Sequence, residues 1–257
     1  MSDPRLTPDP ALVTEETPAS VVVPLSDLCV SPAGRRDRQL LLGDPVTVLG
    51  RTDGWCYLRS EKDGHHGHLR ADALGPRVAT THRVSAAATH VYEGADIKSR
   101  DRLGLSFGSA VTVSALTERF AETPIGFIPR THLAPMEDRA KDPATVAALF
   151  LGTPYLWGGN SRWGIDCSGL VQAALLACGI PCPSDSDLQQ TVGQAAEGPC
   201  RRNDLLFWKG HVALVTDPET MIHANGHSMS VAYEPIDTAI ARIDAAGEGP
   251  VIAHRRF

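Results

Sequence analysis

The sequence predicts an α+β fold, two small all-β barrels followed by a domain of mixed helices and strands, and three observations lead to it. Short β-type runs separated by turn residues fill residues 21–137. These runs repeat after about sixty residues, which is typical of small domains in tandem. After residue 138, capped helical runs alternate with strands. A chain of 257 residues, 42% of them hydrophobic, is long enough to form several such cores.

The first predicted barrel covers residues 21–75. Before it, residues 1–20 are rich in Pro, Asp, Glu and Thr and lack periodicity, so we expect a loose N-terminal arm there. Within the barrel, the run Val46–Leu49 alternates as a half-buried strand does, and Asp53-Gly54 marks a turn. A second turn signal, Asp63-Gly64, predicts a hairpin tip.

The second predicted barrel, residues 76–137, repeats the first. Gly43–Val48 is echoed by Gly108–Val113, and Gly67–Leu74 is echoed by Gly126–Leu133. The pattern of these strands resembles that of bacterial SH3-like domains. It consists of a strand opened by Gly, a strand that begins with Gly-Trp, and a final hydrophobic strand that contains Gly. The second copy shares this pattern except for the Trp.

Three histidines, His65, His66 and His68, lie next to the predicted hairpin tip. No Cys or carboxylate cluster accompanies them, so we expect solvated side chains rather than metal ligands. The six cysteines form no C-x-x-C pair and are irregularly spaced, which argues against a zinc site and a disulfide framework. The sequence therefore predicts neither a metal nor a cofactor.

Composition excludes several classes of partner. The formal net charge is −6 and no basic patch is visible, so we expect neither nucleic acid nor an anionic membrane surface as a partner. No run of eighteen apolar residues predicts a membrane span. The first ten residues lack a basic segment followed by an apolar one, so we expect a cytoplasmic protein. The sequence carries no signal for an oligomeric state.

The third predicted domain, residues 138–257, begins with a helix. Asp142 is its expected N-cap and Pro143 its first residue. The helical run from Ala144 to Leu151 stops at Gly152.

Cys167 is the candidate nucleophile of this domain. It follows a Gly-rich approach and precedes an apolar helical run that ends at Gly179. In the first turn of that helix, unpaired backbone N–H groups would face the sulfur and favour a thiolate. We therefore expect the thiol pKa to lie below its ordinary value, as nucleophilic catalysis requires. The alternative is a helix N-terminus with an incidental cysteine.

Two histidines complete a candidate triad. His211 opens one strand and His223 lies in the next, with a turn at residues 216–220 between them. If the turn centres on Asp217, antiparallel pairing sets His211 opposite His223, with Cβ atoms about 5 Å apart. One ring would then orient the other as a base beside the cysteine. The alternative is two ordinary surface histidines.

These motifs resemble one family. Pro-Tyr-Leu-Trp-Gly-Gly at 154–159, Asp-Cys-Ser-Gly-Leu-Val at 166–171 and Gly-His-Val-Ala-Leu-Val at 210–215 are similar to the NlpC/p60 peptidases, papain-like enzymes that cleave bacterial cell-wall peptides. With the tandem SH3-like domains, the chain looks like the γ-D-glutamyl-L-diamino acid endopeptidases. The resemblance implies Cys167 as nucleophile, His211 as base and His223 as the orienting residue.

The resemblance also implies a closed pocket for the free amino end of the substrate. Its matching residues are Tyr155, Asp166, Ser168, Asp185, Ser186 and, from the first barrel, Asp44. Carboxylates and hydroxyls suit an ammonium group. The family usually has Glu where this chain has Asp44, and His65 stands where a Tyr is expected.

Each pocket residue has a structural alternative. Asp166 has the position of a helix cap, Asp185 and Ser186 precede a further helical run, and Tyr155 can be a packing residue.

The implied activity is hydrolysis of the bond between D-Glu and a diamino acid in small murein peptides with a free N-terminal L-Ala. Such an enzyme would recycle wall peptides. The alternatives are an N-acyl amidase or acyltransferase on the same core, and a wall-peptide binding protein without activity.

Overall fold

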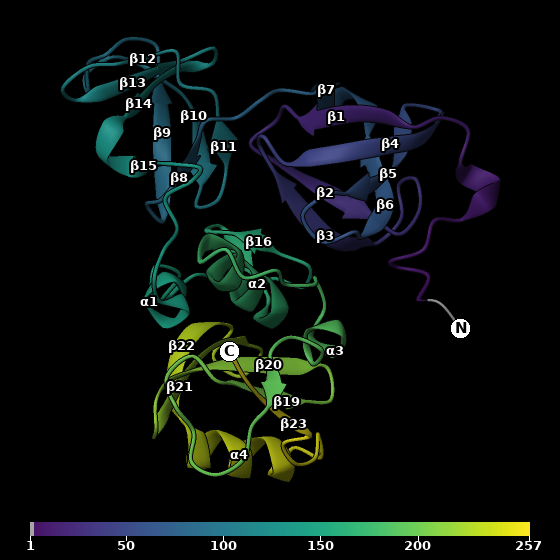
Figure 1. The fold of residues 1–257 in the computed structure, drawn as a ribbon, viewed down its shortest axis with the longest axis vertical. Coiled ribbons are helices and arrows are strands. Elements are labelled where there is room, and N and C mark those ends of the chain that lie inside the picture. Colours follow the sequence, from purple (N-terminus) through teal and green to yellow (C-terminus); the bar gives the residue numbers. More distant parts are fainter. Residues whose placement is uncertain (1–2) are drawn as a thin grey trace. The chain divides into compact units, whose positions relative to one another are not determined.

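The computed structural model describes residues 3–257, which form two compact units (Figure 1). Unit 1 ends at Asp138 and unit 2 is Arg139–Phe257. In the described range, no helix has the length and apolarity needed to cross a membrane.

The first barrel of unit 1 is a seven-stranded sheet with the order β3-β2-β6-β5-β4-β1-β7. Its elements are β1 (Thr17–Val21), β2 (Leu25–Cys29), β3 (Arg36–Leu41), β4 (Pro45–Thr52), β5 (Trp55–Ser60), β6 (His66–Arg70), the 3-10 turn η2 (Ala71–Ala73) and β7 (Leu74–Pro76). Asp53 and Gly54 have positive φ and turn β4 into β5, and Gly64 has positive φ at the β5–β6 tip. Both predicted turns are confirmed.

The described part of the N-terminal arm is bound to this barrel. A short 3-10 turn, η1 (Pro10–Leu12), lies within it, and β1 already begins at Thr17. The carbonyl of Arg5 accepts a hydrogen bond from the backbone N–H of His66 at 2.8 Å. Tyr57 Oη accepts one from the N–H of Asp9 at 2.9 Å.

The second barrel repeats the pairing scheme of the first. Its elements are β8 (His82–Val84), β9 (Ala88–Tyr92), β10 (Asp101–Ser106), β11 (Ala110–Val111), β12 (Ala115–Leu116), β13 (Phe120–Thr123), β14 (Gly126–Pro129), the 3-10 turn η3 (Arg130–His132) and β15 (Leu133–Pro135). β8 pairs with β11 and β15 as β1 pairs with β4 and β7. β14 pairs with β9 and β13 as β6 pairs with β2 and β5. The predicted repeat is confirmed.

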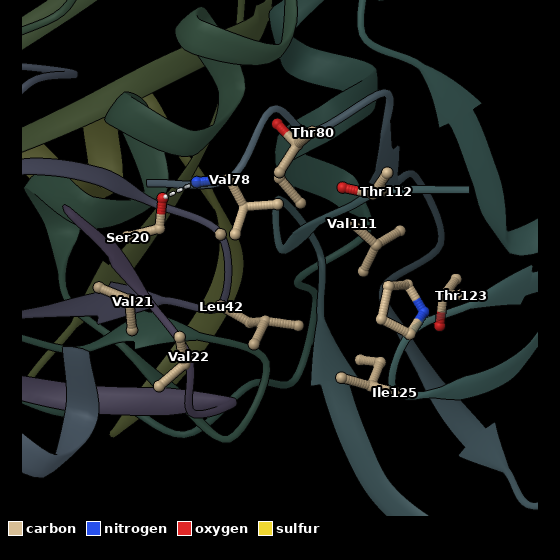
Figure 2. Close-up of a pocket in the computed structure, with 13 residues that line it drawn as sticks. Ser20, Val21, Val22, Leu42, Val78, Thr80, Val111, Thr112, Thr123 and Ile125 are labelled. Carbon is tan, nitrogen blue, oxygen red and sulfur yellow. Dashed lines mark hydrogen bonds between the residues drawn. The ribbon is translucent and has the colours of Figure 1, made fainter. Parts of the chain in front are cut away.

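The two barrels meet within unit 1. Leu42 of the first barrel packs against the core of the second, and its carbonyl accepts a hydrogen bond from the N–H of Ala110 at 2.8 Å. Beside this contact lies an apolar pocket of about 160 Å³, which Figure 2 shows with Val21, Val111 and Ile125 in its wall.

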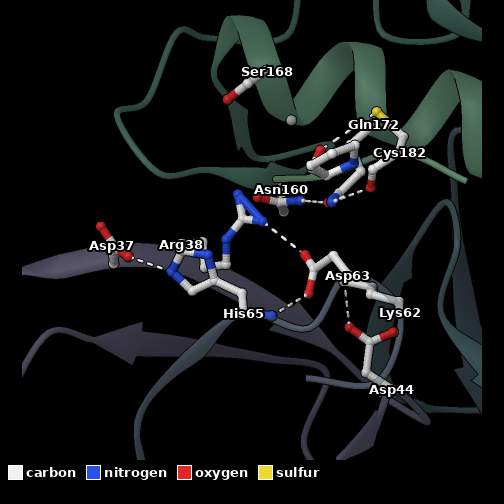
Figure 3. A network of polar contacts seen from close by, with 12 residues as sticks. Asp37, Arg38, Asp44, Lys62, Asp63, His65, Asn160, Ser168, Gln172 and Cys182 are labelled. Carbon is white, nitrogen blue, oxygen red and sulfur yellow. Dashed lines mark hydrogen bonds and ion pairs between the residues drawn. The ribbon is translucent and has the colours of Figure 1, made fainter. Parts of the chain in front are cut away.

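The expectation of solvated histidines at the β5–β6 tip is wrong. His65, His66 and His68 are 1%, 7% and 7% exposed. Figure 3 shows why for the first: His65 Nε2 lies 2.6 Å from an Asp37 oxygen, while its backbone N–H donates to Asp63. The rings of the other two lie against Tyr57. Pairing inside the barrel replaces their contact with water.

Unit 2 is a six-stranded sheet with helices on both faces (Figure 1). The strand order is β18 (Gln194–Ala195), β23 (Ala253–Arg256), β19 (Leu205–Trp208), β20 (His211–Asp217), β21 (Thr220–Asn225) and β22 (Ser230–Pro235). α1 (Pro143–Ala148), α2 (Cys167–Ala177) and the short α3 (Ser186–Gln189) pack on one side, with a small hairpin of β16 (Asn160–Ser161) and β17 (Gly164–Ile165). α4 (Ile236–Ala245) covers the other side, where it shares a core with Trp208, Val215 and Met221.

The first helix of unit 2 begins as predicted. Asp142 is its N-cap and accepts a hydrogen bond from Thr145 N at 3.1 Å, with Pro143 as the first residue. The helix ends at Ala148, and single turns carry the chain to Gly152, which has positive φ.

Candidate active site

Cys167 is the first residue of α2, at the N-terminus of a buried helix. Asp166 is the N-cap, and its carboxylate accepts hydrogen bonds from Gly169 N at 2.7 Å, Ser168 Oγ at 3.0 Å and Gly158 N at 2.9 Å. The absence of a side chain at Gly169 lets the backbone at Gly159 lie close to the helix, because a Cβ at residue 169 would lie 2.6 Å from the carbonyl oxygen of Gly159. The Gly-rich loop therefore packs directly against the first turn that carries the thiol.

The prediction of a lowered thiol pKa is wrong. The backbone N–H groups of Val212, Ser168 and Cys167 face the sulfur and favour its thiolate, as expected at a helix N-terminus. Burial and the neighbouring Asp166 carboxylate outweigh them and raise the pKa of Cys167 to about 12. The resting sulfur is a thiol, so it needs a base to attack a substrate.

The predicted contact between the two histidines is present, but its register differs from the expected one. Nε2 of His211 lies 2.9 Å from Nδ1 of His223, and the ring centroids are 5.1 Å apart. The strands pair Leu214 with Ile222, which sets Ala213 rather than His211 across from His223. The turn centres on Pro218 and Glu219 instead of Asp217, so the rings meet diagonally on one face.

Both imidazoles are neutral in this setting. Burial, with smaller contributions from His223 and Arg242, lowers the pKa of His211 to about 3. Burial lowers the pKa of His223 to about 4 against the opposing effect of Glu234. Val212, whose N–H faces the sulfur, directly follows His211 and so holds the start of β20 beside α2. A neutral imidazole next to a neutral thiol can take its proton.

Two charged residues behind His223 were not predicted from the sequence. Nε2 of His223 lies 3.0 Å from Glu234 Oε2, off the direction of a straight N–H bond. Arg242 donates two hydrogen bonds to the same carboxylate, at 2.9 Å to Oε1 and at 2.8 Å to Oε2. The turn residues Gly226-His227-Ser228 predict a hairpin from which Glu234 could have been found. In this hairpin His223 pairs with Ala232, and Glu234 lies two residues further along the strand on the same face.

Several predicted pocket residues gather around the thiol. Burial and the neighbouring Cys167 and Asp166 raise the pKa of Tyr155, so its phenol lies near both. Ser168 is tied to Asp166 by its hydroxyl. Asp166 also caps α2, so the prediction that this residue is a helix cap is confirmed.

Asp185 and Ser186 lie at the start of α3, as N-cap and first residue. The buried Gln189 connects this segment to the cysteine helix, because its Nε2 donates to the carbonyl oxygens of Ser168 and Pro183 at 2.9 and 3.0 Å. A second buried amide, Gln172, donates to the carbonyl of Cys182 at 3.1 Å (Figure 3). The loop before α3 is thus anchored to α2 at two points.

The sixth predicted pocket residue, Asp44, belongs to the first barrel of unit 1. Its carboxylate lies 2.7 Å from Lys62 Nζ and accepts the N–H of Leu41 at 2.9 Å. These contacts close the turn between β3 and β4. A role of Asp44 in substrate binding stays a prediction from the resemblance.

No group of three or more His, Cys, Asp or Glu side chains is placed to hold a metal ion among residues 3–257. The chemistry that the arrangement offers is that of a thiol beside a pair of hydrogen-bonded imidazoles.

Comparison with known proteins gives two family matches. Residues 152–244 match the NlpC/P60 family, and residues 28–74 match the bacterial dipeptidyl-peptidase SH3 domain. The first match contains Cys167, His211 and His223.

Three curated relatives are similar over different parts of the chain. The γ-D-glutamyl-L-lysine dipeptidyl-peptidase of Bacillus cereus is 35% identical over 108 residues, which are 38% of this chain and 32% of that protein. Dipeptidyl-peptidase 6 of Lysinibacillus sphaericus is 26% identical over 77% of this chain and 83% of its own length. The γ-D-glutamyl-L-lysine dipeptidyl-peptidase of Bacillus subtilis is 28% identical over 72% and 71%.

Among solved structures, an NlpC/P60 family protein from Bacillus cereus has the same fold, with a TM-score of 0.79 and 20% identity over 94% of this chain and 99% of that one. The chain thus carries an NlpC/P60 domain preceded by a bacterial dipeptidyl-peptidase SH3 domain.

Proposed function

We propose that the protein is a cysteine peptidase that hydrolyses the bond between the γ-carboxyl of D-Glu and a diamino acid in cell-wall peptides. The observation that carries the proposal is the 2.9 Å contact between the rings of His211 and His223. The residue after His211, Val212, directs its backbone N–H at the Cys167 sulfur. A thiol, a base and a group that orients the base are the parts of a cysteine peptidase.

The neutral states of thiol and imidazole support one way for the proposed reaction to begin. Because thiol and imidazole are both neutral, His211 takes the Cys167 proton as the sulfur attacks the carbonyl carbon. The backbone N–H of Cys167, at the helix N-terminus, is a candidate donor to the developing oxyanion. The imidazolium then gives its proton to the leaving amine, and a thioester remains. His211 next deprotonates the attacking water and returns the proton to the sulfur.

The relatives support this choice of bond. Two of them are named for the γ-D-glutamyl-L-lysine linkage, and the catalytic candidates lie inside the matched domain. We extend the proposal to peptides with a free N-terminal L-Ala, whose ammonium would be held by the Asp166 carboxylate with Tyr155 and Ser168 beside it. Asp185 and Ser186 are further candidates on the anchored loop. Such an enzyme would recycle wall peptides in the cytoplasm.

The test uses four peptides: L-Ala-γ-D-Glu-L-Lys, its meso-diaminopimelate analogue, and the N-acetylated form of each. We expect release of L-Ala-γ-D-Glu from the free peptides and a loss of at least about tenfold in rate on acetylation, since a buried ammonium contact is worth over 1 kcal/mol. Products are identified by mass spectrometry.

Two variants control the assignment of the nucleophile. Cys167→Ala should abolish hydrolysis, whereas Cys178→Ala, at the other end of the same helix, should retain it. Hydrolysis by Cys167→Ala would reject the nucleophile, and equal rates on free and acetylated peptides would reject the amine pocket in favour of an amidase-like site.

A further inference from the structure

The ring nitrogens of His223 are used by two different partners. Nδ1 faces Nε2 of His211 at 2.9 Å, and Nε2 faces the Glu234 carboxylate at 3.0 Å. A carboxylate accepts hydrogen bonds and never donates when ionised, so it favours a proton on the nitrogen that faces it. His223 is neutral and carries one ring proton, so this proton belongs on Nε2.

This placement determines the state of the next ring. With its proton on Nε2, His223 presents Nδ1 as an acceptor, and the His211 nitrogen at 2.9 Å must be the donor. His211 is then protonated on Nε2 and unprotonated on Nδ1. Only that tautomer leaves an unprotonated nitrogen on the side of His211 away from His223, where a base for the thiol is needed.

Glu234 is itself held in one charge state and one position. The two hydrogen bonds from Arg242 lower the pKa of the Glu234 carboxyl and fix both oxygens. Its side chain is 15% exposed, and that of His223 is fully buried. The contact between them is bent, but at 3.0 Å the two atoms are within hydrogen-bonding distance, and catalytic hydrogen bonds tighten when the substrate complex forms.

We propose that Glu234 is a positioning residue of this site: held by Arg242, it keeps the His223 proton on Nε2 and thereby fixes His211 as a base through Nδ1. The inference rests on the proposed function only in that the thiol is taken as the nucleophile. It adds two members behind His223, Glu234 from β22 and Arg242 from α4.

The charges around the two rings predict opposite effects for the two new members. The groups that act on the two rings are Glu234 from β22, Arg242 from α4 and His227 from the β21–β22 turn, with Glu248 beside Arg242, while Asp166 from α2 acts on the Cys167 thiol. Loss of the Glu234 charge leaves Arg242 unopposed and disfavours an imidazolium. Loss of the Arg242 charge leaves Glu234 unopposed and favours it. A merely structural role would change both variants in the same direction.

The test is the rate of iodoacetamide alkylation of Cys167 at pH 8, followed on its proteolytic peptide by mass spectrometry. It needs no peptide substrate. We expect Glu234→Gln to react about tenfold more slowly than wild type and Arg242→Gln several-fold faster, because one pKa unit changes the imidazolium–thiolate population tenfold. Glu234→Asp, which keeps the charge, should react within about threefold of wild type.

The chain offers matched control variants. Asp204 forms an ion pair with Arg256 and contacts His254 in a similar arrangement beside β19 and β23 of the same sheet. Asp204→Asn and Arg256→Gln make the same chemical changes there, and we expect both to leave the alkylation rate within twofold. In a His223→Ala background, Glu234→Gln should have no further effect, since the coupling passes through that ring.

The outcomes separate this inference from the proposed function. Equal alkylation rates in Glu234→Gln, Arg242→Gln and wild type would overturn the positioning role, even if the wall peptides are cleaved. Opposite shifts with no cleavage of any wall peptide would support the role and reject the substrate. If Glu234→Gln does not fold, Arg242→Gln still decides, because an alkylation rate no faster than that of wild type would reject the role.

Discussion

The same three side-chain types, His, carboxylate and Arg, meet at two places in the sheet of unit 2. On the β21–β22 side, His223 faces Glu234, which Arg242 holds with two hydrogen bonds. At the β19–β23 edge, His254 Nε2 lies 2.7 Å from Asp204, which Arg256 holds at 2.7 and 2.6 Å. The carboxylate at the edge is almost fully buried, and it also accepts the N–H of Arg201.

The difference lies in what the imidazole faces on its other side. Nδ1 of His223 faces His211, so the charge of the Glu234 carboxylate affects a second imidazole ring through His223. The edge group instead joins β23, the last strand of the chain, to the start of β19, and so fixes the C-terminal segment. An imidazole–carboxylate–guanidinium group is therefore not a catalytic signature by itself; its neighbour decides its role.

The largest predicted contrast is in catalysis. We expect His223→Ala to lower kcat for L-Ala-γ-D-Glu-L-Lys by about 10³-fold, because an unoriented base loses most of its effect. His254→Ala should leave kcat within twofold. Steady-state kinetics on both purified variants checks this, and a loss of activity in His254→Ala with an unchanged fold would break the distinction.

Stability should show the reverse order. Asp204→Asn removes an almost fully buried charge that pairs with Arg256 and contacts His254, and it should cost about 3 kcal/mol. Glu234→Gln acts at a more exposed carboxylate and should cost about 1 kcal/mol. Urea unfolding followed by tryptophan fluorescence reports on unit 2, since Trp157, Trp163 and Trp208 lie there. A greater loss in Glu234→Gln would reverse the assignment.

The two groups should also lose stability in different pH ranges. His211 and His223 have folded pKa values below the ordinary 6.5, so the unfolded chain binds protons first and stability falls as pH falls from 6.5 to about 4. The lowered pKa of Asp204 gives a loss only as pH falls below its ordinary value of 3.8. We expect His223→Gln to remove roughly 2 kcal/mol of the first loss, measured by urea unfolding at pH 7 and pH 4. An unchanged loss would contradict the burial of a neutral ring.

Turn and capping residues predicted most of the fold. Asp53-Gly54, Gly64 and the Asp142-Pro143 cap all appear as expected, because local backbone preferences decide such positions. The burial of His65 was not predictable in this way. Its partner Asp37 lies 28 residues earlier in the chain, and only the folded barrel brings the two together.

The site was predicted in its members but not in its detail. The motif around Cys167 and the spacing of the two histidines were sufficient to expect a contact between the rings. The register failed because Pro218 and Glu219 form the turn, and the thiol pKa failed because burial outweighs the helix N-terminus. Glu234 lies on the next strand, where only the turn at residues 226–228 points to it, and Arg242 lies on the following helix, where no motif marks it.

The buried, neutral state of the thiol bears on how this protein withstands oxidants. Peroxide attacks thiolates rather than thiols, and Cys167 is only 7% exposed. Its sulfur becomes reactive at the moment when a bound carbonyl and the neighbouring ring draw the proton away. We therefore expect Cys167 to react slowly with peroxide when no substrate is bound.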